Sequence, residues 1–256
     1  MTRILSVVNQ KGGVGKTTTA VNMATALAAI GKQVLVIDLD PQGNASTGLG
    51  IDQSKRHCTS YDVLIGEASL GQAAVKTAIP RLSVAPATID LSGAEMELIN
   101  EAGREYILRE LLAQVADDYD YILIDCPPSL SLLTLNGLCA AHGVIIPMQC
   151  EYYALEGLSD LVNSIKKVHA NLNRELSIIG LLRVMFDPRV TLQQQVSAQL
   201  EAHFGNKVFK AIVPRNVRLA EAPSHGIPGV VFDRSAKGAQ AYLAFAKEMI
   251  ERVKTL

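Results

Sequence analysis

The stretch Asn9–Thr18, which reads NQKGGVGKTT, decides the fold. It lies between a short apolar run, Ile4–Val8, and a run of residues compatible with a helix, Thr19–Ile30. A strand, a glycine-rich loop and a helix in this order form a cradle for phosphate. Glycine lets the backbone N–H groups turn toward anionic oxygens, and the helix N-terminus adds its partial positive charge. The stretch therefore predicts a phosphate-binding loop.

Two lysines distinguish this loop from the common phosphate-binding pattern G-x-x-x-x-G-K-[ST]. Gln10 occupies the position of the first glycine of that pattern, and Lys11 adds a second lysine at the head of the loop. Lys16 is placed to reach the β- and γ-phosphates of a nucleotide, and the Thr17 hydroxyl is placed to ligate Mg²⁺. The other residues expected to bind the nucleotide here are Gly12, Gly13, Val14, Gly15 and Thr18.

Apolar runs alternate with helical segments along the rest of the chain. Strands are expected at Gln33–Ile37, Leu82–Pro86, Asp120–Asp125, Gly143–Met148, Ser177–Val184 and Val208–Val213. Helices are expected at Ser60–Ile65, Leu70–Val75, Glu95–Val115 (with Gly103 as its weak point), Leu155–Asn171, Leu192–Phe204 and Ala236–Val253. The segment Gly43–Gly50 is expected to be a mobile polar loop outside the core. The alternation predicts an α/β fold with a doubly wound, mostly parallel sheet flanked by helices, built as a single domain of 256 residues.

Composition excludes several classes of protein. Apolar residues make up 48% and charged residues 19%, as in a globular protein. No apolar run approaches the roughly 18–20 residues that span a bilayer, and the first strand leaves no room for a signal peptide. The four cysteines, at positions 58, 126, 139 and 150, show no C-x-x-C spacing. We therefore expect neither a zinc site nor disulfides, but reduced thiols in a cytoplasmic protein.

Charge is distributed unevenly along the chain. The net charge is −1, which is not the charge of an obviously basic nucleic-acid binder. Residues 1–159, however, carry 10 Lys and Arg against 17 Asp and Glu, whereas residues 160–256 carry 14 against 8. This asymmetry favours an anionic partner for the C-terminal half, although solvated helix faces also accumulate lysines.

Acidic residues stand at the ends of two expected strands, where ligands bind in sheets of this kind. Asp125 follows four mostly apolar residues, Tyr121–Ile124, in the Walker B form, and would hold Mg²⁺ through water. Capping of the next turn is the alternative role for this carboxylate. Asp38 and Asp40 alternate around Leu39, so these two side chains cannot play the same role.

The KGGVGKTT loop resembles the deviant Walker A motif of the ParA/MinD ATPase superfamily, in which the extra lysine is the family signature. Asp125-Cys126-Pro127-Pro128-Ser129 resembles the D-x-P-P segment of that superfamily. Three further stretches look like its chromosomal ParA (Soj) branch: SLSLLTLNGL at 129–138, CEYYALEGL at 150–158 and RLAEAPSHG at 218–226. The resemblance covers essentially residues 3–250.

The resemblance implies roles for single residues. Lys11 would reach across a dimer interface to phosphates bound by the other subunit. Asp40, just before Pro41-Gln42, would orient the water that attacks the γ-phosphate; a plain turn-starting role is the alternative. Pro214 and Asn216 would flank the adenine base, to whose edge the Asn216 amide offers a donor and an acceptor. Met185 would pack on the base or, alternatively, be a core methionine.

The resemblance also implies a function, DNA segregation driven by ATP and Mg²⁺. An ATP-bound sandwich homodimer would bind double-stranded DNA non-specifically on the nucleoid, and a ParB-type partner would stimulate the hydrolysis that releases it. Arg189 and Arg218 match arginines that the Soj branch uses for DNA, and Lys247 would extend that surface. Alternatively, both arginines are solvated or pair with acids.

Three other functions stay open at this level. A MinD-like ATPase would cycle on a membrane, but the last expected helix mixes Lys247, Arg252 and Lys254 with Glu248 and Glu251 and lacks the pure basic face of a membrane helix. A reductase like the nitrogenase iron protein shares the loop and needs paired cysteines for a bridging cluster. An ATPase that positions a protein cargo is the alternative that the sequence separates least well.

Overall fold

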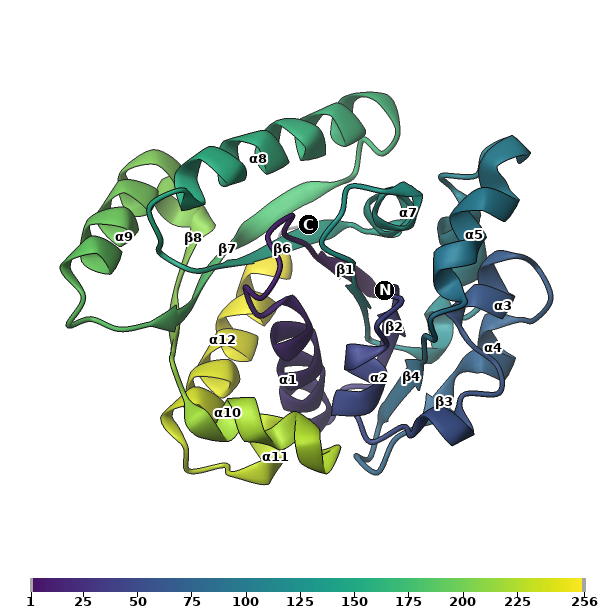
Figure 1. The fold of residues 1–256 in the computed structure, drawn as a ribbon, viewed down its shortest axis with the longest axis horizontal. Helices are drawn as coiled ribbons and strands as arrows, with labels where there is room; N and C mark the ends of the chain where they lie inside the picture. The colour runs from purple at the N-terminus through teal and green to yellow at the C-terminus, as the bar shows by residue number, and fades with distance from the viewer. Residues whose placement is uncertain (1, 255–256) are drawn as a thin grey trace.

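A computed structural model describes residues 2–254 of the chain. Eight strands form one sheet in the order β3-β4-β2-β5-β1-β6-β7-β8, and every ladder is parallel except β3/β4 (Figure 1). The strands are β1 (Arg3–Val7), β2 (Val34–Asp38), β3 (Val75–Lys76), β4 (Leu82–Ala85), β5 (Tyr121–Asp125), β6 (Gly143–Met148), β7 (Ser177–Phe186) and β8 (Val208–Pro214). The predicted doubly wound α/β fold is confirmed.

Helices cover both faces of the sheet. One face carries α1 (Lys16–Ala29), α2 (Asn44–Gly48), α10 (Val217–Glu221), α11 (Gly229–Phe232) and α12 (Lys237–Val253). The other carries α3 (Ser60–Leu64), α4 (Leu70–Ala73), α5 (Leu91–Glu97) with the 3₁₀ turn η2 (Leu98–Asn100), α6 (Ile107–Ala113), α7 (Leu132–Ala140), α8 (Ala154–Asn171) and α9 (Thr191–Phe204). Further 3₁₀ turns are η1 (Gln53–Lys55), η3 (Ala116–Asp118), η4 (Gly205–Lys207) and η5 (Ala222–His225).

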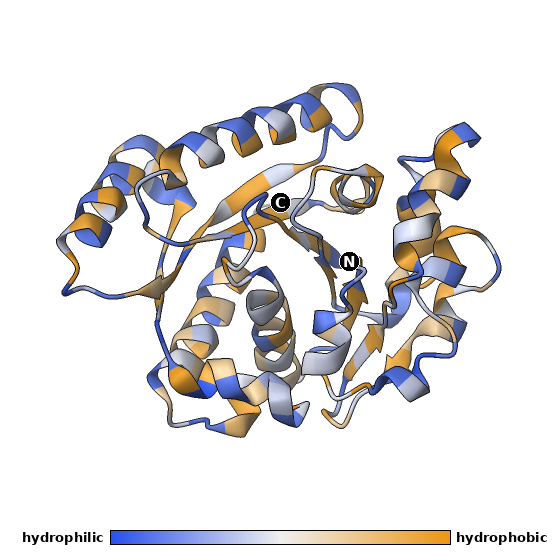
Figure 2. Cartoon of the chain, viewed as in Figure 1, coloured by the Kyte–Doolittle hydropathy of each residue, from blue (hydrophilic) through white to orange (hydrophobic). Residues whose placement is uncertain are grey.

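The alternation of side chains along each strand builds two cores. In β5, Ile122 and Ile124 point into the cluster beneath α3–α9, whereas Leu123 points into the cluster beneath α1 and α12. Figure 2 shows the corresponding amphipathic pattern on α8, whose outer side is hydrophilic and whose inner side is hydrophobic. The central strands are therefore buried on both faces, which explains why they are continuous apolar runs in the sequence.

The segment Gly43–Gly50 is not the mobile loop that its composition predicts. It contains α2, and both Ala45 and Ser46 are fully buried. Ser46 is turned inward, because its N–H and hydroxyl both donate to the Asp38 carboxylate, at 2.8 and 2.7 Å. Arg56 closes the segment by donating to the Thr47 hydroxyl and the Ala87 carbonyl. A polar sequence thus forms a fixed, buried element through hydrogen bonds.

The helix predicted over Glu95–Val115, with Gly103 as its weak point, is not continuous. The chain forms α5 and η2, then a turn, and then α6, which begins at Ile107. Gly103 lies in the turn with φ 72°, a left-handed conformation that ends a helix and that glycine adopts without strain. The break occurs at the position that the sequence marks as weak.

Besides α2 and the short 3₁₀ turns, four elements are not predicted by the sequence pattern: β3, α7, α10 and α11. The two-residue strand β3 is too short to show an alternating pattern. α7 is only nine residues long and almost uniformly apolar, so it has no amphipathic period. The remaining predicted strands and helices are confirmed to within a few residues at each end.

A histidine completes the first rung between β1 and the segment that leads into β6. The His142 Nδ1 accepts a hydrogen bond from the Ile4 N–H at 3.0 Å, and the His142 backbone N–H donates to the Ile4 carbonyl at 2.9 Å. Partial burial lowers the pKa of His142, the Arg3 charge lowers it slightly further and Glu175 opposes the shift. The folded state therefore favours the neutral ring, because a protonated Nδ1 cannot accept from Ile4.

We expect this ring to make folding pH-dependent. A histidine whose folded pKa is lowered contributes stability that is present above its unfolded pKa, about 6.5, and is lost as the pH falls through that value. The loss should be on the order of 0.5–1.5 kcal/mol, the net contribution of one hydrogen bond. Urea unfolding at pH 7.5 and 5.5 measures it. His142→Asn, which presents a non-titrating acceptor, should lose less stability than the wild type over the same interval, and equal losses would contradict the assignment.

Candidate nucleotide-binding site

The ends of three neighbouring strands bring the predicted site residues together. In the sheet, β5 lies between β1 and β2, with Asp125 level with Val7 on one side and with Asp38 on the other. The glycine-rich loop leaves β1 at this same edge and leads into α1 (Figure 1). The loop and the acidic residues at both neighbouring strand ends therefore share one small volume.

The loop takes the conformation of an anion cradle. Gly13 and Gly15 have φ values of 72° and 77°, which a residue with a Cβ adopts only with strain. Gly15 is the N-cap of α1, and no side chain caps this helix. The N–H groups at the start of α1 are consequently directed toward whatever occupies the loop, together with the positive end of the helix dipole.

Lys16, the first residue of α1, is buried beneath the loop with 7% of its surface exposed. Its ammonium group donates to the Lys11 carbonyl at 3.1 Å. Burial lowers the pKa of Lys16, while the nearby Asp125 and Asp40 carboxylates raise it. The ammonium is thus a desolvated cation at the base of the cradle, where its attraction for phosphate is screened little by water.

Asp125 is fully buried, and neither of its carboxylate oxygens has a hydrogen-bond partner among residues 2–254. Burial raises the pKa of Asp125 well above its usual range, and the Asp38 charge raises it further, while Thr17 and Lys16 oppose the rise. A buried carboxylate without a partner is costly unless a cation or proton neutralises it. These orphaned oxygens, with the Thr17 hydroxyl nearby, fit a hard cation such as Mg²⁺.

No group of three or more His, Cys, Asp or Glu side chains within residues 2–254 is arranged to hold a metal. A dedicated metal cage made only of such side chains is therefore not the form of this site. Mg²⁺ at nucleotide sites normally binds one or two protein groups, and phosphates and water complete its shell. The pair Thr17 and Asp125 suits that arrangement.

Asp38 and Asp40 have different surroundings, as their alternation around Leu39 predicts. The Asp38 carboxylate accepts from Ser46 and, through Oδ1, from the Asp40 N–H at 3.2 Å. Burial raises the pKa of Asp38 to about 6, although these hydrogen bonds oppose the rise. Asp40 lies at the edge of the buried region with 8% exposure, and its Oδ1 accepts from the Gln42 N–H at 3.0 Å. Asp38 is therefore committed to structure, and Asp40 is the carboxylate that faces the loop.

A cavity of about 140 Å³ adjoins the loop. Its lining includes Gly15, Thr18, Met185, Pro214 and Asn216, which are the loop and the predicted base-contacting residues. The Asn216 Oδ1 accepts from the Leu219 N–H at 3.2 Å and caps α10, so the amide Nδ2 is the group left for a ligand. The sequence pattern indicates only a loop at this stretch and does not reveal the helix that the asparagine caps.

Two residues that follow β6 are not predicted as site residues. The Gln149 amide donates to the Gly13 carbonyl at 3.2 Å and lies 3.1 Å from the Met185 sulfur, so it connects the loop with the base cavity. Glu151 forms an ion pair with Lys11. The rule that ligands bind at the C-terminal ends of strands could have identified both, since they directly follow the Gly143–Met148 strand.

The three predicted DNA contacts lie on three different elements. Arg189, between β7 and α9, has 87% of its side chain exposed and forms two hydrogen bonds to Asp187, whose pKa it lowers to about 2. Arg218, on α10, is 56% exposed and pairs with Glu221 and Asp233. Lys247 is exposed on α12. Both arginines are therefore accessible but paired with acids, which was the alternative for them, and a phosphate would have to compete with these carboxylates.

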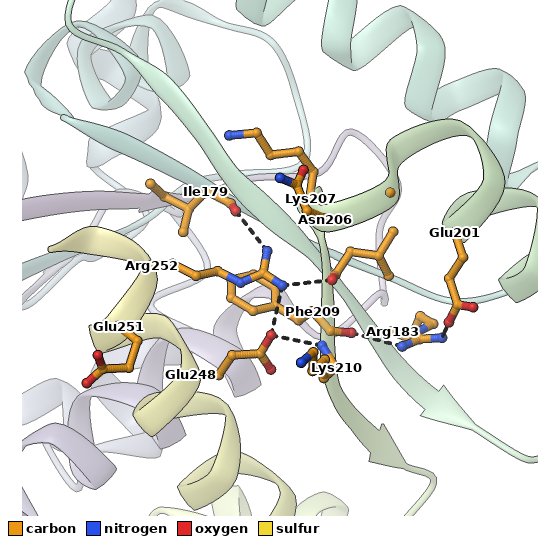
Figure 3. Close-up of a pocket in the computed structure, with 12 residues that line it drawn as sticks. Ile179, Arg183, Glu201, Asn206, Lys207, Phe209, Lys210, Glu248, Glu251 and Arg252 are labelled. Carbon is orange, nitrogen blue, oxygen red and sulfur yellow. Dashed lines mark hydrogen bonds and ion pairs between the residues drawn. The ribbon is translucent and has the colours of Figure 1, made fainter. Parts of the chain in front are cut away.

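A larger cavity, of about 890 Å³, lies beside β7 and the edge strand β8, whose ladder is irregular (Figure 3). Its charged groups are used within the fold. Arg252 donates to the Val208 carbonyl and to Glu248, both at 2.7 Å, and Arg183 donates to the Phe209 carbonyl at 2.8 Å. These contacts hold an edge strand whose regular pairing is interrupted, and they place no catalytic group in the cavity.

Comparison with known proteins agrees with this geometry. A family model described as an AAA domain matches residues 2–178. The chain is 54% identical to the chromosome partitioning protein ParA of Caulobacter vibrioides, over 98% of this chain and 94% of that protein. It is 51% identical to the sporulation initiation inhibitor protein Soj of Bacillus subtilis, over 97% and 98% of the two chains. A crystal structure from Mycobacterium smegmatis, described as cobyrinic acid a,c-diamide synthase with bound ADP and magnesium, is 40% identical with a TM-score of 0.87 and covers 100% of this chain and 96% of its own.

Proposed function

The chain belongs to the ParA/Soj family of chromosome-partitioning ATPases, and from this premise we propose how its residues use ATP to segregate DNA. The protein hydrolyses ATP and uses Mg²⁺. One observation carries the proposal. The N-terminus of α1, the buried Lys16 and the unpartnered Asp125 carboxylate lie together at the C-terminal edge of the sheet. We propose that the whole chain acts as one ATPase domain on the nucleoid. None of the helices within residues 2–254 is long and apolar enough to cross a membrane.

The loop would bind the phosphates, and each group has a distinct task. Backbone N–H groups from Gly12 to Thr18 would surround the phosphate oxygens, and Lys16 would neutralise charge on the β- and γ-phosphates. Thr17 and Asp125 would hold Mg²⁺, which supplies charge neutralisation for the transferring phosphoryl group. Met185 and Pro214 would enclose the adenine base in the 140 Å³ cavity.

Asp40 would orient the water that attacks the γ-phosphate. Its Oδ1 accepts from the Gln42 N–H and its backbone N–H donates to Asp38, so both the carboxylate and the backbone of Asp40 are held in place. Phosphoryl transfer depends on positioning more than on covalent assistance, so one fixed carboxylate suffices for this role.

ATP would also drive formation of a homodimer, through Lys11. This lysine is half exposed and, in the single chain, pairs with Glu151 at the surface. Exposed pairs of this kind contribute little to stability, so the lysine can exchange Glu151 for a phosphate bound to a second subunit at small cost. Dimerisation would thus be coupled to the presence of the triphosphate. A ParB-type partner would then stimulate hydrolysis and release the dimer from DNA.

A DNA-binding assay with ATP, ADP and no nucleotide tests this function. Retention of DNA of any sequence should require ATP, and addition of the ParB-type protein should release it and increase ATP turnover. DNA binding that is equal under all three nucleotide conditions would contradict the proposed switch. Restoration of binding by a slowly hydrolysed ATP analogue, in the presence of the partner, serves as the control.

We expect Arg189→Ala and Arg218→Ala each to weaken DNA binding irrespective of sequence. Each arginine occurs twice in a dimer, so each substitution removes up to two contacts with phosphate. Removal of one such contact should lower the slope of log K against log salt by about 0.9. Titration of fluorescent duplex DNA at several salt concentrations measures both effects. ATP binding and dimerisation should be unaltered.

Lys55→Ala is the matched control for these arginines, because Lys55 is also exposed and paired with an acid, Asp52, but lies in the acidic half of the chain. The control should leave affinity and salt slope unchanged. Full-strength DNA binding by the double arginine variant at moderate salt would exclude this surface. Lys247→Ala, on α12, shows whether the surface extends to the last helix.

A further inference from the structure

The short helix formed by α5 and η2 is apolar on two sides. Its inner side packs into the core through Leu91, Ala94 and Leu98, all of which are buried. A surface helix needs only one apolar face, and a helix that is apolar all round is normally buried. The composition of the outer side therefore requires a separate explanation.

The outer side exposes three large apolar side chains. Ile89 is 64% exposed, Met96 79% and Ile99 58%. Met96 and Ile99 are three residues apart and lie on one helical face, and Ile89 lies in the turn that leads into α5. Exposed apolar side chains that gather in one patch, unlike scattered ones, mark sites of protein–protein interaction. We call the patch formed by Ile89, Met96 and Ile99 the α5 surface.

The segment that carries the α5 surface is acidic. Residues 82–103 contain four carboxylates and no Lys or Arg. Asp90 and Glu101 are exposed beside the apolar patch. The next basic residue, Arg104, is turned onto the Ile99 carbonyl. The excess of acidic residues in this segment disfavours DNA and anionic lipid and favours a cationic partner.

A hydrogen bond connects α5 to α7, the helix that follows the strand end at Asp125. The Glu95 Oε1 accepts from the Leu133 N–H at 3.2 Å, in the first turn of α7. α7 follows the short loop that leaves β5 after Asp125. A ligand that shifts α5 would therefore act on the loop next to the orphaned carboxylate.

We propose that the α5 surface docks a cationic amphipathic segment of the partner that stimulates hydrolysis, a proposal that rests on the partner-stimulated switch described above. Apolar side chains of that segment cover Met96 and Ile99, and its Lys or Arg side chains face Asp90 and Glu101. Docking acts on the loop after Asp125 through Glu95 and α7. The surface thus combines the anchoring patch of an interface with a route to the catalytic site.

The full-length chain and the ParB-type protein from the same genome provide the test. We expect Met96→Ser/Ile99→Ser to weaken partner binding at least tenfold and to lower partner-stimulated ATP turnover, with basal turnover and DNA binding unaltered. Glu101→Lys should weaken binding more at low salt than at high salt, because salt screens the attraction that the substitution removes. Hydrogen exchange should show protection of residues 89–101 when the partner is added to the wild type.

Ile30→Ser is the matched control, since Ile30 is 49% exposed at the end of α1, on the other face of the sheet, and its loss should change nothing. Normal partner binding by Met96→Ser/Ile99→Ser would overturn the α5 surface while leaving the proposed function intact. A change in self-association of that variant, with normal partner binding, would assign the patch to a second copy of this chain and overturn the proposal as well. A wild-type chain that the partner neither binds nor stimulates would overturn the proposed partner itself.

Discussion

Replacement of Lys16 by alanine should reduce ATP and ADP affinity by about 100-fold or more. The ammonium is a buried cation next to Asp125 and Asp40, so its removal leaves two carboxylates facing the phosphates without compensation. Removing one partner of a buried charge interaction costs about 3–5 kcal/mol, which corresponds to more than two orders of magnitude in affinity. Titration with a fluorescent nucleotide at low protein concentration measures the loss.

Lys11→Ala is the control within the same loop. Lys11 is half exposed, and we expect the variant to bind nucleotide normally as a monomer but to fail to dimerise with a slowly hydrolysed ATP analogue. Size-exclusion chromatography separates these outcomes. Wild-type nucleotide affinity in Lys16→Ala would refute the assignment of the buried lysine, and a normal dimer of Lys11→Ala would refute contact across the interface.

The sequence was sufficient for the fold class because the central strands are buried on both faces. Such strands appear as continuous apolar runs, and Gly143–Met148 was predicted with its correct bounds. Segments whose structure depends on distant partners could not be predicted. The polar stretch Gly43–Gly50 contains a partly buried helix, which Asp38 and Arg56 hold through hydrogen bonds to Ser46 and Thr47. Hydrogen bonds of this kind leave no periodic signal.

The residues of the candidate site also fall into two groups, those that a local motif predicts and those whose position depends on distant segments. The loop and Lys16 could be identified from a local motif, since their geometry depends on neighbouring residues in the chain. That Asp38 lies level with Asp125 depends on the order β2-β5-β1, which no local pattern specifies. The contacts of Gln149, with Gly13 and Met185, join segments more than 30 residues apart, so its place directly after the Gly143–Met148 strand is the one sequence signal for it. The α5 surface could not be recognised because Met96 and Ile99 fit the expected long amphipathic helix Glu95–Val115, whose core-facing residues are also apolar.

Replacement of Asp40 by alanine should slow ATP hydrolysis by about 100-fold or more, the range for loss of a positioned catalytic group. Binding of ATP should change by less than about threefold, because the loop, Lys16 and the Thr17–Asp125 pair make the ground-state contacts. With ATP, the variant should therefore accumulate as a dimer that stays on DNA. Single-turnover hydrolysis and DNA retention, measured on the same preparation, test both halves of this expectation.

Asp38 is the control for the Asp40 assignment, because it is the neighbouring carboxylate that could be mistaken for the catalytic one. Its carboxylate already accepts from Ser46 and from the Asp40 N–H, and it is fully buried, so it cannot also orient a water at the γ-phosphate. Asp38→Asn should consequently lower the urea midpoint, since it disturbs the anchor of α2, whereas Asp40→Ala should leave that midpoint nearly unchanged. If Asp40→Ala turned over ATP at the wild-type rate, and Asp38→Asn lost turnover without losing stability, the assignment of the two carboxylates would be reversed. The contrast between a stability loss at position 38 and a rate loss at position 40 is what the hydrogen bonds around the two residues require.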